Sequence, residues 1–212
     1  MEKQSSSNPE ENSNIEKEIQ PEIIETVEGL DILTVEDRIN LLLVFSGLKS
    51  AATIDVVENW QERDAQEMQE SKDQIERLET SLKVSGVAFD SPGIESVKLF
   101  EYDQVSISIG NTKEDLELLI KAIESNNPDL IGRAYGFPST SIEAFTGKRK
   151  RLNRKNLPKE VRESDGLAFC FFILSKDNWE EEIKQGKRNA DYIKKISPYL
   201  YEKIMKYNKG KK

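Results

Sequence analysis

The sequence contains no histidine and only one cysteine among its 212 residues. A Ser-His-Asp or Cys-His triad, a zinc finger and any metal site with imidazole ligands are therefore excluded. Cys170 has no partner for an internal disulfide. It lies in the apolar run LAFCFFIL, which favours a buried and unreactive thiol. We predict no catalytic residue, no metal and no cofactor for this chain.

Long apolar stretches are also absent, because no segment approaches the roughly 18 apolar residues of a membrane span. The first residues, MEKQSSSNPEENSN, contain no apolar core of a signal peptide. Together with the single cysteine, these absences predict a cytoplasmic protein that contacts no membrane. No glycine loop of the dinucleotide-binding or Walker type is present. Glu101 and Asp103 beside Lys98 leave a metal-dependent nuclease as the one enzymatic alternative.

Charge is distributed unevenly along the chain, although its net value is −8. Residues 1–30 contain eight acids and two bases, residues 31–130 contain 21 acids and nine bases, and residues 131–212 contain 10 acids and 20 bases. Since affinity for phosphate depends on local charge, the basic C-terminal part is compatible with a nucleic-acid partner. A solvated lysine-rich surface would produce the same counts.

Composition and periodicity divide the first 84 residues into two regions. Residues 1–30 are rich in Glu, Ser, Asn and Gln, which predicts a disordered acidic tail. Residues 31–84 predict a helical arm, with a short helix over 34–45 that Thr34 caps and a long helix over about 53–83. A heptad placed on the long helix has apolar ends and a polar middle, which is compatible with packing inside the chain or with a weak dimer seam. This helix is therefore our candidate for binding a protein partner or for self-association through residues 53–83.

Residues 85–212 predict an α+β domain. Alternating apolar side chains indicate strands over 96–102 and 104–110, and the continuous apolar run over 167–174 indicates a central buried strand. The remaining apolar stripes have helical spacing. The expected fold class is α+β and mostly helical, with a small sheet of about three strands covered by helices.

Capping patterns locate the helices of this domain. The predicted caps are Thr112 with Asp115, Asn127 before Pro128, Asp177 with Glu180, and Ser197 before Pro198. Gly186 lies on the apolar stripe of the helix that follows Asp177. A glycine on such a stripe predicts the close approach of a neighbouring element.

The stretch PDLIGRAYGFPSTSIEAFTG contains two short helical segments around a glycine turn. A first helix begins at Pro128 and ends near Gly136, where a glycine accommodates the left-handed conformation of a sharp turn. Thr140, with Glu143 three positions later, predicts the cap of a second helix. Over residues 129–147 only, this pattern resembles the helix-turn-helix motif of bacterial DNA-binding proteins.

The resemblance implies that small side chains at the start of the second helix approach base edges. These side chains are Ser139, Thr140 and Ser141. The stretch that follows, GKRKRLNRKNLPK, has the density of cations that phosphate neutralisation requires. Its cations are Lys148, Arg149, Lys150, Arg151, Arg154, Lys155 and Lys159.

We therefore predict a non-enzymatic, nucleic-acid-associated binding or regulatory protein, with DNA as the expected partner. In this interpretation the helix-turn-helix-like segment docks and the basic loop holds the backbone, which supplies affinity without sequence information. The alternative is a protein-interaction or scaffold protein in which the helical corner is structural. A hypothesis compatible with either is that the acidic residues 1–83 bind the basic loop and compete with phosphate.

Overall fold

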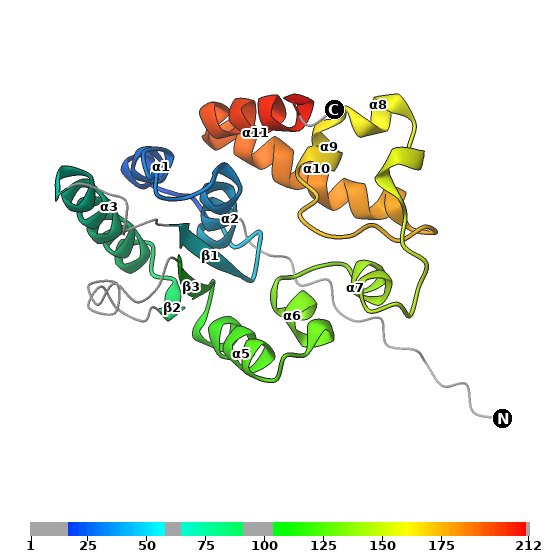
Figure 1. The fold of residues 1–212 in the computed structure, drawn as a ribbon, viewed down its shortest axis with the longest axis horizontal. Coiled ribbons are helices and arrows are strands. Elements are labelled where there is room, and N and C mark those ends of the chain that lie inside the picture. The colour runs from blue at the N-terminus through cyan, green and yellow to red at the C-terminus, as the bar shows by residue number, and fades with distance from the viewer. Residues whose placement is uncertain (1–16, 58–64, 91–103, 211–212) are drawn as a thin grey trace.

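The computed structural model describes residues 17–57, 65–90 and 104–210. The protein is α+β and mostly helical, with helices packed against a small antiparallel sheet, which confirms the predicted fold class (Figure 1). The strands are β1 (Ala51–Val57), β2 (Ala88–Asp90) and β3 (Gln104–Gly110). The helices are α1 (Pro21–Glu28), α2 (Val35–Phe45), α3 (Ala65–Val84), α5 (Lys113–Glu124), α6 (Pro128–Ala134), α7 (Ser139–Phe145), α8 (Lys159–Arg162), α9 (Asp165–Ala168), α10 (Trp179–Ile196) and α11 (Pro198–Gly210).

The sheet has the strand order β1-β3-β2, and both pairings are antiparallel. Ile54 of β1 lies opposite Ile107 of β3, and Phe89 of β2 lies opposite Ile109. The central strand β3 spans the residues for which a strand was predicted. The second strand of the predicted hairpin, over 96–102, lies outside the described residues.

The strand β1 lies where the start of the long helix was predicted, so that part of the prediction is wrong. Ile54 and Val56 are buried, whereas Thr53 and Asp55 are partly exposed, which is the two-residue period of a strand. The helical interpretation used Ile54 with Val57, whose spacing also fits one face of a helix. β-branched side chains favour the strand, and pairing with β3 supplies its hydrogen bonds.

The helix α3 contributes its apolar face to the main core. Ile75, Leu78 and Leu82, the last three apolar positions of the predicted heptad, are buried in the same cluster as Val27 of α1. Because these side chains are buried within one chain, they are not available to form a seam between two chains. Self-association through residues 53–83 therefore stays a prediction that these three side chains do not support.

The helix α1 corrects the prediction that the first 30 residues are disordered. Ile23 and Val27 of this helix are buried, and so is Leu30 just after it. Pro21 stands in the first turn, where its missing N–H leaves no intrahelical hydrogen bond unmade. These three apolar side chains, spaced four and three residues apart, attach an otherwise polar segment to the core. The first 16 residues of the predicted tail lie outside the described residues.

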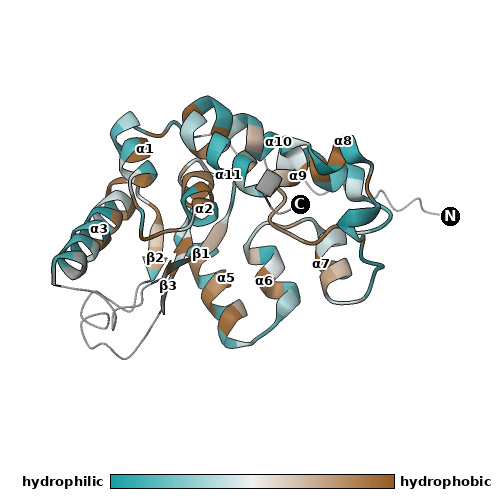
Figure 2. Ribbon diagram, turned by 45° about the horizontal axis from the view of Figure 1, so that its top comes forward, coloured by the Kyte–Doolittle hydropathy of each residue, from teal (hydrophilic) through white to brown (hydrophobic). Residues whose placement is uncertain are grey.

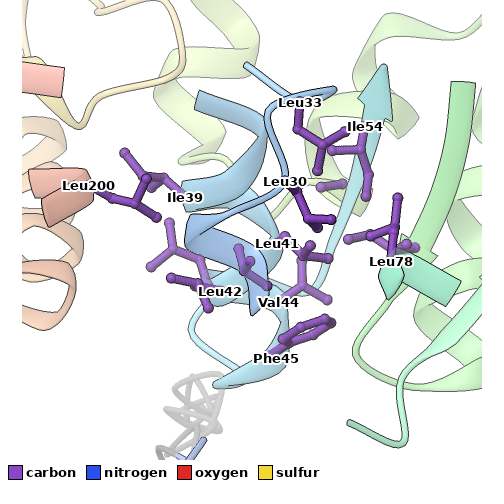
Figure 3. Packing of buried hydrophobic residues seen from close by; sticks show 14 of the residues in the cluster. Leu30, Leu33, Ile39, Leu41, Leu42, Val44, Phe45, Ile54, Leu78 and Leu200 are labelled. Carbon is purple, nitrogen blue, oxygen red and sulfur yellow. The ribbon is translucent and has the colours of Figure 1, made fainter. Parts of the chain in front are cut away.

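The helix α2 contributes Ile39 and the continuous run 41–45 to the main core, and Figure 2 shows hydrophobic colour on this helix. Every residue from 38 to 45 is buried. Figure 3 shows Ile39 beside Leu200 of α11, with Leu41 on the side of β1 and α3. The predicted cap is confirmed, since the Thr34 hydroxyl accepts a hydrogen bond from the Asp37 backbone N–H at 3.1 Å. Because residues 38–45 of this helix are all buried, α2 ties the predicted arm to the rest of the protein.

Residues 167–174 do not form the predicted central strand. The side chain of Ser164 caps the short helix α9, and the chain then continues without regular structure to an isolated β-bridge between Arg151 and Ser175. Phe169 is completely buried in the main core, and Leu174 is buried in a second cluster beside it. Burial was predicted correctly, but a short apolar run does not distinguish a strand from other buried backbone.

Two more predicted features of the C-terminal part have clear outcomes. The capping box of α5 is confirmed, because Thr112 accepts from the Asp115 N–H and the Asp115 carboxylate accepts from the Thr112 N–H. The cap of α10 is wrong, because that helix begins at Trp179 and its N-terminus has no side-chain cap. Instead, the carboxylate of Glu182 accepts a hydrogen bond from the Ser175 backbone N–H at 2.7 Å.

Candidate interaction surface

The helices α6 and α7 form the two arms of the predicted corner. The Asn127 side chain caps α6 by accepting from the N–H groups of Asp129 and Leu130. Gly136 has a φ of 70°, which confirms the left-handed turn. A Cβ on Gly132 would lie 2.7 Å from Cγ1 of Ile142, so the two helices cross at this glycine. The chain thus contains the two predicted short helices around a glycine turn, and the resemblance to a helix-turn-helix motif stays a prediction.

The small side chains at the start of α7 point mainly into the protein. Ser139 is exposed, but Ser141 is buried and its hydroxyl donates to the Ile173 carbonyl at 2.6 Å. The Thr140 hydroxyl donates to Oε1 of Glu182 at 2.6 Å. The predicted cap by Thr140 and Glu143 is wrong, because Pro138 occupies the cap position. Two of the three predicted base-contacting hydroxyls are therefore engaged within the chain.

Carboxylates lie beside the start of α7. The first turn of α10 contains Glu180, Glu181 and Glu182. Glu181 and Glu182 line the same surface groove as Pro138 and Thr140. Lys184 and Arg188 line the same groove, and Lys184 pairs with Glu181, so the groove has no net negative charge. Base contacts by α7 are disfavoured instead because the Thr140 and Ser141 hydroxyls are engaged within the chain.

Two cations of the basic loop neutralise the carboxylates of the corner. Nζ of Lys148 lies 2.7 Å from a carboxylate oxygen of Asp129 on α6. Nε of Arg149 lies 2.9 Å from a carboxylate oxygen of Glu143 on α7. Each pair is partly exposed, and such pairs contribute about 1 kcal/mol or less to stability. Their main consequence is that neither helix presents an uncompensated acid here.

Two arginines of the loop hold backbone carbonyls. Arg151 donates from Nε to the Ala144 carbonyl and from its terminal nitrogen to that of Phe145, and so satisfies the C-terminal end of α7. Arg154 donates to the carbonyls of Cys170 and Phe172 at 2.8 and 2.9 Å. These contacts fix the loop against the irregular segment that follows α9, so both arginines have structural roles.

The remaining predicted cations are Lys150, Lys155 and Lys159. All three are exposed, and none forms an ion pair within the part of the chain that the structure describes. The bridge between Arg151 and Ser175 places Lys150 opposite Lys176. Like charges in such positions repel each other, so an anion near them would be attracted.

An apolar pocket of about 230 Å³ lies between α6, α7 and residues 171–173. Its lining consists of Pro128, Ile131, Gly132, Tyr135, Phe137, Ser141, Ile142, Phe145, Phe171, Phe172 and Ile173. Phe145 is 49% exposed. The packing of an irregular segment against two helices forms this pocket, so no sequence pattern could have located it.

Lys49 is a feature of the corner that sequence reasoning missed. Its Nζ donates to Oδ1 of Asn40 at 2.7 Å and lies 5.4 and 5.7 Å from the ring centres of Tyr135 and Phe137. The lysine follows α2 and thus joins the core to the turn between α6 and α7. A single lysine after an apolar helix carries no signal that would have identified it.

Burial lowers the pKa of Lys49 to about 8, although the charges of Glu36 and Asp37 act in the opposite direction. Because this folded-state pKa is below the ordinary value of 10.5, protonation opposes folding, and stability should increase as pH rises from about 8 to 10.5. We expect Lys49→Met to remove about 1 to 2 kcal/mol of that increase, since solvent screens a partly exposed amine. Urea unfolding of both proteins at pH 7.5 and 10 measures the difference. An equal pH response in the two proteins would contradict it.

The single cysteine has the predicted environment. Cys170 is 3% exposed, and its thiol lies 3.1 Å from the Gly166 carbonyl, to which it donates. Burial raises the pKa of this thiol to about 12, so it is protonated at neutral pH.

The residues of the nuclease alternative lie outside the described residues. They are Glu101, Asp103 and Lys98.

Comparison with known proteins gives no relative for this chain. A scan against models of protein families, a search of curated proteins and a search of solved structures each found no match. Within residues 17–57, 65–90 and 104–210, no helix is long and apolar enough to cross a membrane. Function therefore has to be argued from the residues of the surface.

Proposed function

We infer that the protein binds the phosphate backbone of nucleic acid through the lysines of its basic loop, without reading the base sequence. The observation that supports this proposal most is the exposure of Lys150, Lys155 and Lys159 without a carboxylate partner in the described parts of the chain. Exposed ammonium groups that have no carboxylate partner can replace the counterions of phosphates, and the release of those counterions drives association.

The anchoring of the loop strengthens this proposal. Arg151 holds it to a backbone carbonyl of α7, and Arg154, the first residue of the 3-10 helix Arg154–Asn156, holds it to carbonyls of the segment after α9. A loop fixed in this way loses little conformational entropy when its lysines meet phosphates. Lys176, opposite Lys150, extends the same positive surface.

The environment of α7 supports contact with the backbone rather than with bases. The hydroxyls of Thr140 and Ser141 are engaged within the chain, and Glu181 lies beside the start of the helix. Base-specific recognition uses donors and acceptors that are free to face base edges. We therefore propose that α7 positions the loop.

Replacing Lys150, Lys155 and Lys159 with alanine should reduce binding of the full chain to a fluorescent DNA duplex by at least tenfold at low salt. The control replaces Lys113, Lys121 and Lys184, which are also exposed and lie on α5 and α10. Lys113 and Lys184 differ from the loop lysines in that they form surface ion pairs with Glu117 and Glu181. This control changes the net charge by the same amount and should bind as the wild type does. Equal losses in the two variants, or no binding of the wild type, would contradict the proposal.

The second candidate function, a protein-interaction role, is favoured by the apolar pocket.

Masking of the basic loop by residues 1–83 of the same chain is less favoured for the described part of this segment, because α3 lies far from the loop. Figures 1 and 2 both show α3 at one end of the molecule and α7 and α8 at the other. A cytoplasmic location, expected from the scarcity of cysteine, stays a prediction.

A further inference from the structure

The apolar pocket has the size of one side chain. Its volume of about 230 Å³ is below the roughly 300 to 1,000 Å³ of pockets that enclose whole small-molecule ligands. Binding energy between proteins is concentrated where an aromatic anchor fills a well-packed pocket of this kind. The walls are supplied by two helices and a fixed segment, so the pocket exists before any partner arrives.

An apolar group could enter the pocket without leaving a hydroxyl unpaired. The two hydroxyl groups in its lining belong to Ser141 and Tyr135. The first donates to the Ile173 carbonyl, and the second donates to Oγ1 of Thr53 at 3.0 Å. Displacement of water by an aromatic ring would therefore cost no hydrogen bond from these groups.

The rim of the pocket is positively charged. Phe145, at 49% exposure, has the Arg151 guanidinium 5.5 Å from its ring centre. The carboxylates on the lining helices, Asp129 and Glu143, are each paired with a cation of the basic loop. The guanidinium is thus the charge at this rim that no described carboxylate compensates. A segment with carboxylates would be complementary to it.

We propose that the pocket is a docking site for one aromatic side chain in an acidic segment of another protein. The aromatic ring would fill the space between Ile131, Ile142 and Phe145, and the flanking carboxylates would face the Arg151 guanidinium. The acidic start of this chain does not supply such an anchor, because residues 1–14 contain no large apolar side chain apart from Met1. This site is separate from the phosphate-binding lysines, and the two can fail independently.

The test uses the full chain and three fluorescent peptides. The first has one tryptophan between two pairs of acidic residues, the second has alanine in place of the tryptophan, and the third has serines in place of the acids. We expect the tryptophan peptide to bind at least about tenfold more tightly than the alanine peptide, a difference of about 1.4 kcal/mol, because truncation of an anchor residue costs at least this much. Its advantage over the serine peptide should shrink as salt is added, because screening weakens the charge contacts.

Phe145→Ala should reduce binding of the tryptophan peptide about tenfold, and Phe145→Leu should retain part of it. Tyr199→Ala is the matched control, because Tyr199 is another exposed aromatic residue, 45% exposed, on α11. The lysine triple variant should keep the preference for tryptophan over alanine. The proposal is overturned if the tryptophan and alanine peptides bind equally or if Phe145→Ala has no effect.

Occupation of the pocket by a second copy of this chain has to be distinguished from occupation by a different protein. Trp60 has acidic neighbours in the sequence, Glu58 and Glu62, and lies outside the described residues. Sedimentation of the wild type and of Phe145→Ala separates the two cases. A monomeric wild type is expected. A dimer that Phe145→Ala dissociates would overturn the assignment to another protein.

Discussion

Replacing Gly186 with alanine should lower the free energy of unfolding by about 3 kcal/mol. A Cβ at this position would lie 2.1 Å from the Gly166 carbonyl oxygen and 2.5 Å from the sulfur of Cys170. The oxygen belongs to the backbone of α9, so neither helix can avoid the methyl group by rotating a side chain. Alanine is otherwise the better residue in a helix, by about 1 kcal/mol. A loss of stability would therefore report the close approach of α9 and α10.

Urea unfolding at constant temperature measures this effect. Lys184→Ala provides the control, because this exposed residue of α10 forms a surface ion pair with Glu181, and its change should cost less than about 0.5 kcal/mol. Cys170→Ala combined with Gly186→Ala should recover only part of the loss, since the backbone clash remains. An alanine variant as stable as the wild type would mean that α9 and α10 lie further apart than described.

Removing the carboxylate of Glu182 should have the second largest effect, a loss of about 2 to 3 kcal/mol for Glu182→Ala. This side chain is 2% exposed, and it accepts hydrogen bonds from the Thr140 hydroxyl and the Ser175 N–H. Hydrogen bonds to a charged acceptor are stronger than those between neutral groups. In the alanine variant the buried Ser175 N–H would have lost its acceptor, so α7 and the bridge at Ser175 would both loosen.

The neighbouring residue supplies the control for this prediction. Glu181→Ala removes an exposed carboxylate from the same turn and should change stability by less than about 0.5 kcal/mol. Glu182→Gln keeps one acceptor oxygen and should lose roughly half as much as the alanine variant. Amide hydrogen exchange at Ser175 gives a local reading. Equal exchange rates in the wild type and in Glu182→Ala would show that this hydrogen bond does not hold the corner.

Local signals predicted the fold where they depend on neighbouring residues. Thr34, Thr112 and Asn127 cap helices as expected, because a cap is completed within three residues of the chain. Gly186 was also correctly interpreted as a point of close approach. Two local signals failed, since neither Thr140 with Glu143 nor Asp177 with Glu180 caps a helix. The other failures needed distant partners. The strand β1 exists through pairing with β3, and residues 167–174 are buried without joining the sheet.

The candidate site was predictable as a set of cations but not as a surface. Charge density identified the basic loop, yet it could not show that Lys148 pairs with Asp129, 19 residues away. Nor could it separate Arg154, which holds two carbonyls of the segment after α9, from Lys155, which has no ion pair among the described residues. The packing of elements far apart in the sequence decides which cations remain available to a ligand.

The salt dependence of duplex binding tests the central claim most directly. Log affinity of the full wild-type chain should fall linearly with the logarithm of salt concentration. If Lys150, Lys155 and Lys159 each neutralise one phosphate, replacing all three with alanine should make the slope shallower by about 2.7, whereas the Lys113, Lys121 and Lys184 control should keep the wild-type slope. An unchanged slope in the loop variant would contradict the assignment of these lysines to the phosphate backbone.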